Sequence, residues 1–207
     1  MIEIGVLALQ GDVAEHLQAI RAASAKTKIP ISLRTVRTAK ELEGLHGLLL
    51  PGGESTTLSL LLQKEGMLEP MREIPGLFGT CAGFILMAKE VEGAVEAQHM
   101  LEVMDVKVDR NAYGSQVDSF ESVLEMTGEK FDLGKTRILF IRAPKIIKTG
   151  AAVTVLAKLP TTGEPVIIEE RKPGRFFLGA SCHPELRTSK AHEYFLKELM
   201  ETLGAKA

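Results

Sequence analysis

The stretch Gly79-Thr80-Cys81-Ala82-Gly83 decides the fold that we expect for this chain. An apolar run over 74–78 precedes it, as in a buried strand, and a helical pattern over 84–89 follows it. A nucleophile flanked by glycines between a strand and a helix is typical of a sharp turn that presents the nucleophile at its tip. Glycines on both sides keep side chains from crowding such a turn, and the N-terminus of the helix favours a thiolate. The stretch therefore predicts a nucleophilic Cys81, although a cysteine is more commonly a small buried apolar residue.

The composition of the chain limits the classes of protein to which it can belong. The chain has 207 residues, 25% of them charged and 45% apolar, so we expect one domain over 1–207. A net charge of −2 gives no reason to expect nucleic acid or an anionic membrane as partner. No apolar run is long enough to span a bilayer, and the N-terminal residues do not resemble a signal peptide. Two cysteines and no zinc-ligand spacing predict a protein of the reducing cytoplasm without a metal site.

Strands and helices alternate in the first half of the sequence. Apolar runs predict strands over 2–9, 31–36, 47–50 and 76–80. Helical patterns follow Asp12 and cover 39–45, 57–64 and 82–90. Such βα repeats predict a parallel sheet with helices on both faces. Asp12, three residues before Glu15, is expected to cap its helix through a capping box.

The second half changes character, because short apolar runs follow one another with few helices between them. Strands are predicted over 103–108, 120–126, 137–141, 152–156, 166–169 and 176–180, and a closing helix over 189–203. We expect most of these strands to add antiparallel pairs, and 176–180 to return to the main sheet. The predicted fold is therefore α/β, with a mostly parallel central sheet extended by antiparallel strands.

A second motif is Ser181-Cys182-His183-Pro184-Glu185. Proline favours an extended backbone before it, and residues two apart in an extended chain point to the same side. His183 and Glu185 can then face one cleft, where the carboxylate would orient the imidazole and the imidazole would activate a thiol. Alone, the motif is equally a turn with Glu185 in water; combined with the Cys81 turn, it favours a Cys-His-Glu triad.

The remaining histidines and the second cysteine have no such setting. His16 and His192 fall on predicted helices, where we expect surface or partly buried side chains. Cys182 should point opposite to His183, into the core. A disulfide between Cys81 and Cys182 would remove the predicted nucleophile and does not suit a reducing compartment.

A third motif is Pro51-Gly52-Gly53-Glu54-Ser55-Thr56-Thr57, between a strand and a helix. Free backbone N–H groups there would lie at the carboxyl edge of the sheet, where open α/β sheets bind ligands. The segment lacks the ending of a phosphate-binding P-loop, which favours an oxyanion site made by the N–H groups of Gly53 and Ala82. A plain tight turn is the alternative. Arg110 and Arg142 each follow a predicted strand and could bind a carboxylate, unless they simply lie in water.

Together these motifs resemble the triad-type glutamine amidotransferases, and among them the glutaminase subunits of two-component pyridoxal 5′-phosphate synthases. The resemblance runs nearly end to end and includes the segments Ile4–Asp12, Leu50–Thr57, Phe78–Gly83, Gln116–Glu121, Ile141–Pro144 and His183–Leu186. The cysteine turn and the His-x-Glu pair are common to the wider class, whereas Gly-Glu-Ser-Thr-Thr, Asp-Ser-Phe-Glu and Ile-Arg-Ala-Pro are specific to these subunits.

The resemblance implies a flavodoxin-like three-layer sandwich and a division of labour among residues. Cys81 would be the nucleophile, His183 the base and Glu185 its orienting carboxylate. The implied glutamine site comprises Gly53, Glu54, Ser55, Arg110, Ile141 and Arg142, and Gln10 would lie near the oxyanion site and the contact with the synthase. The family needs no cofactor in its glutaminase component, and its partner is a (β/α)8 synthase subunit that uses the ammonia.

Two other functions stay open on the residues alone. The chain could serve a different synthase, such as one for histidine or purine precursors. It could also be a cysteine-dependent hydrolase or stress protein on the same sheet, although such proteins typically lack a His-x-Glu pair on the last strand.

Overall fold

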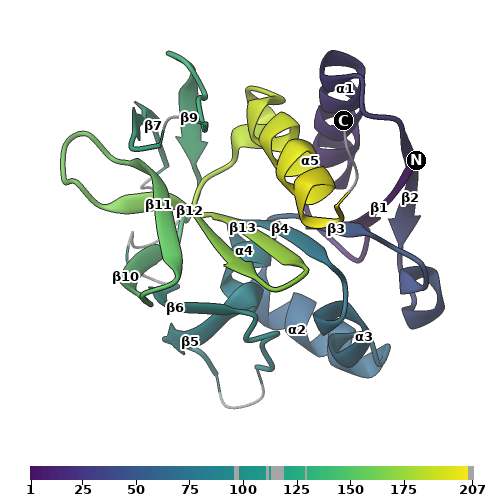
Figure 1. The fold of residues 1–207 in the computed structure, drawn as a ribbon. Coiled ribbons are helices and arrows are strands. Elements are labelled where there is room, and N and C mark those ends of the chain that lie inside the picture. The colour runs from purple at the N-terminus through teal and green to yellow at the C-terminus, as the bar shows by residue number, and fades with distance from the viewer. Residues whose placement is uncertain (96–97, 111, 113–118, 129, 205–207) are drawn as a thin grey trace.

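The computed structural model describes residues 1–95, 98–110, 112, 119–128 and 130–204. An eight-stranded sheet, in the order β2-β1-β3-β4-β13-β12-β11-β8, forms the centre of the molecule (Figure 1). Its parallel part comprises β1 (Ile2–Leu7), β2 (Ile31–Val36), β3 (Gly47–Leu50), β4 (Gly76–Thr80) and β13 (Arg175–Ala180). The predicted return of the last strand to the main sheet is confirmed, since β13 pairs with β4 in parallel.

Helices cover both faces of this sheet, as the near-continuous apolar strands require. α1 (Val13–Thr27) and α5 (Lys190–Thr202) lie side by side on one face (Figure 1). α2 (Ser55–Lys64), α3 (Leu68–Arg72) and α4 (Ala82–Met87) lie on the other. Each face has its own apolar core, so the α/β three-layer arrangement expected from the sequence is present.

Antiparallel strands complete the structure. β12 (Pro165–Lys172), β11 (Val153–Lys158) and β8 (Glu125–Met126) extend the central sheet beyond β13. A small sheet contains β10 (Lys145–Thr149), β6 (Met104–Asp109) and β5 (Ala88–Glu92). β7 (Phe120–Val123) pairs with β9 (Arg137–Phe140).

Several local predictions were wrong. The helix predicted over 82–90 ends at Met87, and the chain enters β5, because pairing with β6 overrides the helical pattern of the sequence. The strand predicted over 120–126 is two strands that belong to different sheets. The helix predicted over 39–45 is a 3₁₀ turn, η1 (Ala39–Leu42). β5, β10 and α3 were not predicted.

The parallel strands bring four connections to one edge of the sheet. The segments after β1, β3, β4 and β13 all leave from the carboxyl ends of neighbouring strands. This edge is where open α/β sheets bind ligands. It gathers the three motifs singled out in the sequence.

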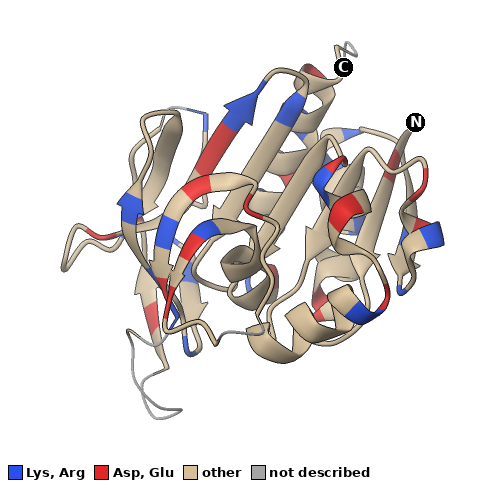
Figure 2. Ribbon diagram, turned by 90° about the horizontal axis from the view of Figure 1, so that it is seen from below, with Lys and Arg blue, Asp and Glu red and all other residues tan. Residues whose placement is uncertain are grey.

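Charged residues of both signs are interspersed over the elements seen in Figure 2. Within the described residues, no helix has both the length and the apolar character that a membrane span needs.

Candidate active site

The backbone at Cys81 makes a sharp, strained turn between β4 and α4. Its φ of 48° and ψ of −109° lie where few non-glycine residues are found. Such a conformation costs about 1–3 kcal/mol and is concentrated at functional sites. The flanking glycine matters: a Cβ at Gly83 would lie 1.9 Å from the carbonyl oxygen of Leu50 on β3. The turn therefore packs against β3 only because position 83 has no side chain.

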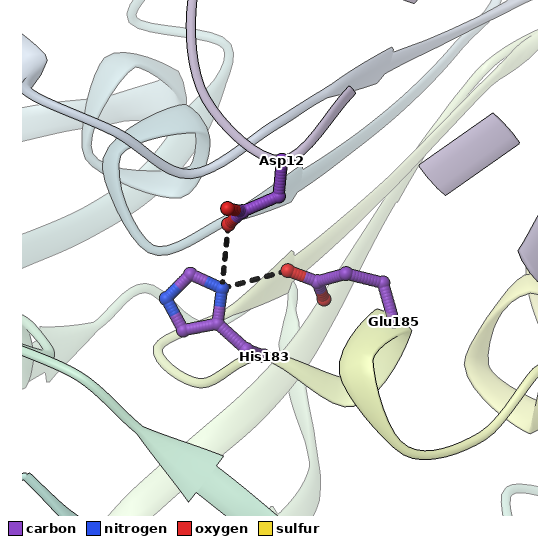
Figure 3. A group of neighbouring side chains, drawn as sticks. All are labelled: Asp12, His183 and Glu185. Atoms are coloured by element: carbon purple, nitrogen blue, oxygen red, sulfur yellow. Dashed lines mark hydrogen bonds and ion pairs between the residues drawn. The ribbon is translucent and has the colours of Figure 1, made fainter. Parts of the chain in front are cut away.

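His183 and Glu185 meet in the way that the triad requires. The Nδ1–H of His183 donates to Oε1 of Glu185 over 2.7 Å (Figure 3). The route differs from the extended strand expected: His183 bridges to Leu139, and a 3₁₀ turn, η2 (Pro184–Leu186), carries Glu185 back toward the ring. The proline thus starts a turn instead of continuing a strand.

The sulfur of Cys81 borders the cavity that His183 also lines. Sγ lies 3.7 Å from the carbonyl oxygen of Ile141, and Cys81 is one of the groups that raise the pKa of His183. Cys81 is 6% exposed. The nucleophile expected from the sequence is thus nearly enclosed, at the wall of a small cavity.

Asp12 is a further member of the site, and sequence reasoning missed it. Its Oδ2 lies 3.1 Å from Nδ1 of His183 (Figure 3). The predicted capping box is wrong, since the Asp12 side chain accepts no bond from the start of α1. The structure shows how the first loop reaches the triad: Gly11 packs so closely against the Pro51–Gly53 loop that a Cβ would lie 1.7 Å from the Gly52 oxygen.

These contacts shift the ionisation of the histidine. Burial alone would lower the pKa of His183, but hydrogen bonds with Asp12, Cys81 and Glu185 outweigh it and raise the pKa to about 12. The hydrogen bond with His183 in turn lowers the pKa of Asp12, against the opposing effect of its partial burial. The site favours an imidazolium held between two carboxylates.

The residues predicted to bind substrate border the same cavity as Cys81. Its volume is about 210 Å³. Two lining residues, Asp12 and Ile85, were not predicted. The remaining lining residues are Gly53, Glu54, Ser55, Cys81, Ala82, Arg110, Ile141, Arg142 and His183. Both expected oxyanion donors, Gly53 and Ala82, thus line the same cavity as Cys81.

Glu54 and Arg110 organise one wall of the cavity. The Glu54 carboxylate caps α2, accepting from the N–H groups of Thr56 at 3.2 Å and Thr57 at 2.7 Å. Arg110 donates to Oε1 of Glu54 over 3.0 Å and to the Thr56 hydroxyl over 2.8 Å. Partial burial alone would raise the pKa of Glu54, but the hydrogen bonds from Thr56 and Thr57 and the charge of Arg110 outweigh it and lower the pKa. The wall is thus a charged pair anchored to the start of a helix.

Gln10 supports this wall from the first loop. Its Nε2 donates to the carbonyl oxygen of Glu54 over 2.5 Å. Gly53, with a φ of 140°, lies against the Gln10 side chain, where a Cβ would come within 3.3 Å of Cδ. Gln10 is outside the cavity lining and acts on it through the Gly53–Glu54 segment.

The grouping of Asp12, His183 and Glu185 also meets the distance criterion for a metal site. One ligand atom from each residue lies within 4.8 Å of the other two. The 2.7 Å and 3.1 Å contacts are equally those of one ring nitrogen shared by two carboxylates. No metal is needed to account for the arrangement.

The other residues singled out in the sequence agree only in part with the burial expected of them. His16 and His192 are completely buried, so the expectation of surface or partly buried side chains was wrong. Cys182 is buried in the core, as expected, and both cysteines are free thiols. Of the quoted segment Gln116–Glu121, positions 116–118 lie outside the described residues.

A mixed α/β sheet with a glycine-flanked cysteine facing a histidine and a glutamate at its carboxyl edge is the architecture of a class I glutamine amidotransferase. A solved glutamine amidotransferase matches 98% of this chain and 99% of its own length, with a TM-score of 0.78 and 40% identity. A putative GMP synthase component from Thermoplasma acidophilum shares the fold alone, with a TM-score of 0.61 and 16% identity over 99% of this chain and 94% of its own.

The chain belongs to the SNO glutamine amidotransferase family, whose model matches residues 6–201. It is 41% identical over 205 residues to the pyridoxal 5′-phosphate synthase subunit PdxT of Thermococcus onnurineus, covering 97% of this chain and all of the relative. The subunit of the same name from Corynebacterium jeikeium is 44% identical over 199 residues, covering 94% of this chain and 95% of the relative.

Proposed function

We propose that this chain hydrolyses L-glutamine to L-glutamate and ammonia, and supplies the ammonia to a pyridoxal 5′-phosphate synthase. The observation that carries the reaction is the position of His183, which lines the same cavity as Cys81 at the carboxyl edge of the sheet and donates to Glu185 through Nδ1. The biosynthetic role rests on relatives that are named as subunits of this synthase and that match this chain over almost their whole length.

The triad would act in two half-reactions. His183 takes the proton of Cys81 and becomes the imidazolium that Asp12 and Glu185 stabilise, and the thiolate attacks the amide carbon of glutamine. The imidazolium then gives its proton to the amide nitrogen, the C–N bond breaks, ammonia departs, and a thioester remains on Cys81. Water attacks the thioester with His183 as base, so that glutamate leaves and the thiol is restored. Proton transfer of this kind typically contributes a factor of about 10²–10⁴.

The cavity lining would bind the rest of the substrate. Backbone N–H groups of Gly53 and Ala82 would stabilise the oxyanion, and one such donor is typically worth about 3 kcal/mol of barrier. Arg142, exposed at the cavity, would bind the substrate carboxylate. Glu54, Ser55, Arg110 and Ile141 complete the lining.

The partner in this proposal is a (β/α)8 synthase subunit. Docking of the synthase subunit would act on the cavity through Gln10, because the Gln10 side chain donates to the carbonyl of Glu54 and lies against Gly53, the proposed oxyanion donor. The proposed steps need only the side chains and backbone of this chain, glutamine and water. The free thiols of Cys81 and Cys182 suit a reducing compartment such as the cytoplasm.

The test is a glutaminase assay of the chain alone, of the chain mixed with the synthase subunit, and of the same mixture with Cys81→Ala. We expect glutamate release in the mixture, none with Cys81→Ala, and unchanged association of the variant with the synthase. A wild-type mixture that releases no glutamate would overturn the function. Turnover by Cys81→Ala would overturn the assignment of the nucleophile.

A further inference from the structure

A row of buried polar side chains lies behind Glu185, on the side away from the cavity. The hydroxyl of Thr80 lies 3.3 Å from Oε1 of Glu185 and 3.0 Å from Nε2 of His16. Nδ1 of His16 lies 3.0 Å from Nε2 of His192. Thr80, His16 and His192 are each 0% exposed. Four elements thus meet through one line of hydrogen bonds: η2, β4, α1 and α5.

The direction of these hydrogen bonds follows from what each group can donate. A carboxylate only accepts, so the single hydroxyl proton of Thr80 goes to Glu185. Thr80 must then accept from His16, whose proton is on Nε2. That nitrogen is also 3.8 Å from Oε1 of Glu185, where an N–H is attracted and a lone pair would be repelled.

The far end of the row agrees with this direction. With its proton on Nε2, His16 offers the lone pair of Nδ1 to the Nε2–H of His192. His192 Nδ1 has no partner among the described residues and would hold a lone pair. The opposite direction would leave a buried N–H there without an acceptor and would take the hydroxyl proton away from Glu185. A buried orphan donor is the rarer and more expensive outcome.

Both rings are neutral in this arrangement. Burial lowers the pKa of His16 to about 4, although Glu185 and Asp12 oppose this, and His192 and His183 add to it. Burial lowers the pKa of His192 to about 3. Neutral rings each carry one proton, which is the number that a one-way row of hydrogen bonds needs.

We infer that His192, His16 and Thr80 form a one-way chain of hydrogen bonds that fixes the Glu185 carboxylate, and that they are positioning residues for the triad. The inference rests on the proposed function. Oε2 of Glu185 has no hydrogen-bond partner within the described residues, so Oε1 carries both the bond from His183 and the bond from Thr80. Thr80 directly precedes Cys81. One side chain thus links the strand that carries the nucleophile to the carboxylate that orients the base.

The first test needs no activity. Imidazole ¹⁵N chemical shifts of the uniformly labelled chain at neutral pH distinguish the two neutral tautomers and the charged ring. We expect His16 and His192 both to be neutral with the proton on Nε2. A proton on Nδ1 of either ring, or a charged ring, would overturn the one-way chain.

The second test measures turnover of the complex with the synthase subunit. Thr80→Val keeps the shape of the side chain but removes the hydroxyl, whereas Thr80→Ser keeps it. We expect Thr80→Val to lower kcat about tenfold with KM unchanged, since one hydrogen bond to a charged group is involved, and Thr80→Ser to stay close to wild type. Thr161→Val, in an exposed turn, is the matched control.

The outcomes separate this inference from the proposed function. If the wild-type complex does not hydrolyse glutamine, the proposed function is overturned. The ¹⁵N measurement of the His16 and His192 tautomers then still tests the one-way chain of hydrogen bonds. If the wild-type complex is active and Thr80→Val keeps its kcat, the positioning role is overturned. Loss of turnover in Thr80→Ser as well would also overturn it, because packing and not the hydroxyl would then be responsible.

Discussion

Asp12 places a second carboxylate 3.1 Å from Nδ1 of His183, the ring nitrogen that already donates to Glu185. The single Nδ1–H is shared by the two carboxylates, and its contact with Glu185, at 2.7 Å, is the shorter one. Asp12 stabilises the imidazolium through its hydrogen bond with the ring and through its charge. His183, the proposed base, is therefore held from two loops, one after β1 and one after β13.

Asp12→Asn should lower the pKa of His183. The substitution removes one of two negative charges beside the ring, and an opposite charge at this distance is typically worth roughly one to three pH units. The midpoint can be followed through the imidazole ¹⁵N shifts of His183 as the pH is raised. Asp132→Asn is the control, because Asp132 bonds to Lys190 and the Gly134 backbone instead. An unchanged midpoint would show that Asp12 does not act on the ring.

The same variant should change stability with pH in a defined direction. The pKa of Asp12 is lowered from 3.8, so its charged form stabilises the fold above that pH, and this contribution disappears as the pH falls through the lowered pKa. Asp12→Asn should thus be less stable than wild type at neutral pH, and the two should converge in acid. Urea unfolding at several pH values measures the difference. A gap that widened in acid would contradict this sign.

Glu185→Gln should reduce turnover less than His183→Ala. Removing His183, the proposed base, removes the proton transfers of both half-reactions, and the loss of kcat is expected to be about 10²–10⁴-fold. Removing the Glu185 charge leaves Asp12 beside Nδ1, so part of the orientation and of the charge stabilisation survives. The measurement is kcat of each variant in the complex with the synthase. A larger loss for Glu185→Gln would mean that this carboxylate does more than orient the ring.

The sequence was sufficient for the parts of the fold that local pattern determines. Strands 47–50 and 76–80 were predicted with the bounds observed, because fully buried parallel strands are apolar runs bounded by turns. The bounds of 31–36 were also predicted, although this edge strand is mostly only partly buried. β5 was missed because it continues directly from α4 and owes its strand conformation to pairing with β6. Pairing between distant segments leaves no local pattern to find.

The candidate site shows the same division. Cys81, His183 and Glu185 lie in motifs whose spacing has a chemical reason, so the sequence alone was enough to predict them as a triad. His16 and His192 lie in ordinary helical patterns and meet only where α1 packs against α5, whereas Asp12 reaches His183 from the loop after β1. A residue that acts through tertiary packing carries no motif, so its burial could not be predicted from periodicity.

Arg110→Ala should raise KM for glutamine more than it lowers kcat. Its guanidinium donates to Glu54, Thr56 and Gln98, which fixes one wall of the cavity but not the triad. Losing a hydrogen bond to a charged partner typically costs about 1.5–3 kcal/mol, so KM should rise roughly tenfold or more. Arg110→Lys should not restore KM, since an ammonium cannot make these forked contacts. Arg137→Ala, on the exposed edge of β9, is the control, and a fall confined to kcat would argue against a role in binding.

Gly83→Ala should destabilise the fold and disrupt the cysteine turn together. The added Cβ would lie 1.9 Å from the Leu50 oxygen, a backbone atom of a central strand that cannot move aside. Overpacking of this kind typically costs about 1–3 kcal/mol, and here relief would require α4 and Cys81 to shift. Urea unfolding gives the loss of stability, and alkylation of Cys81 by iodoacetamide reports on the turn. Gly128→Ala is the matched control, because its Cβ would meet only the Leu156 side chain at 3.7 Å. Equal stability of the two variants would show that the contact between α4 and β3 is looser than the structure indicates.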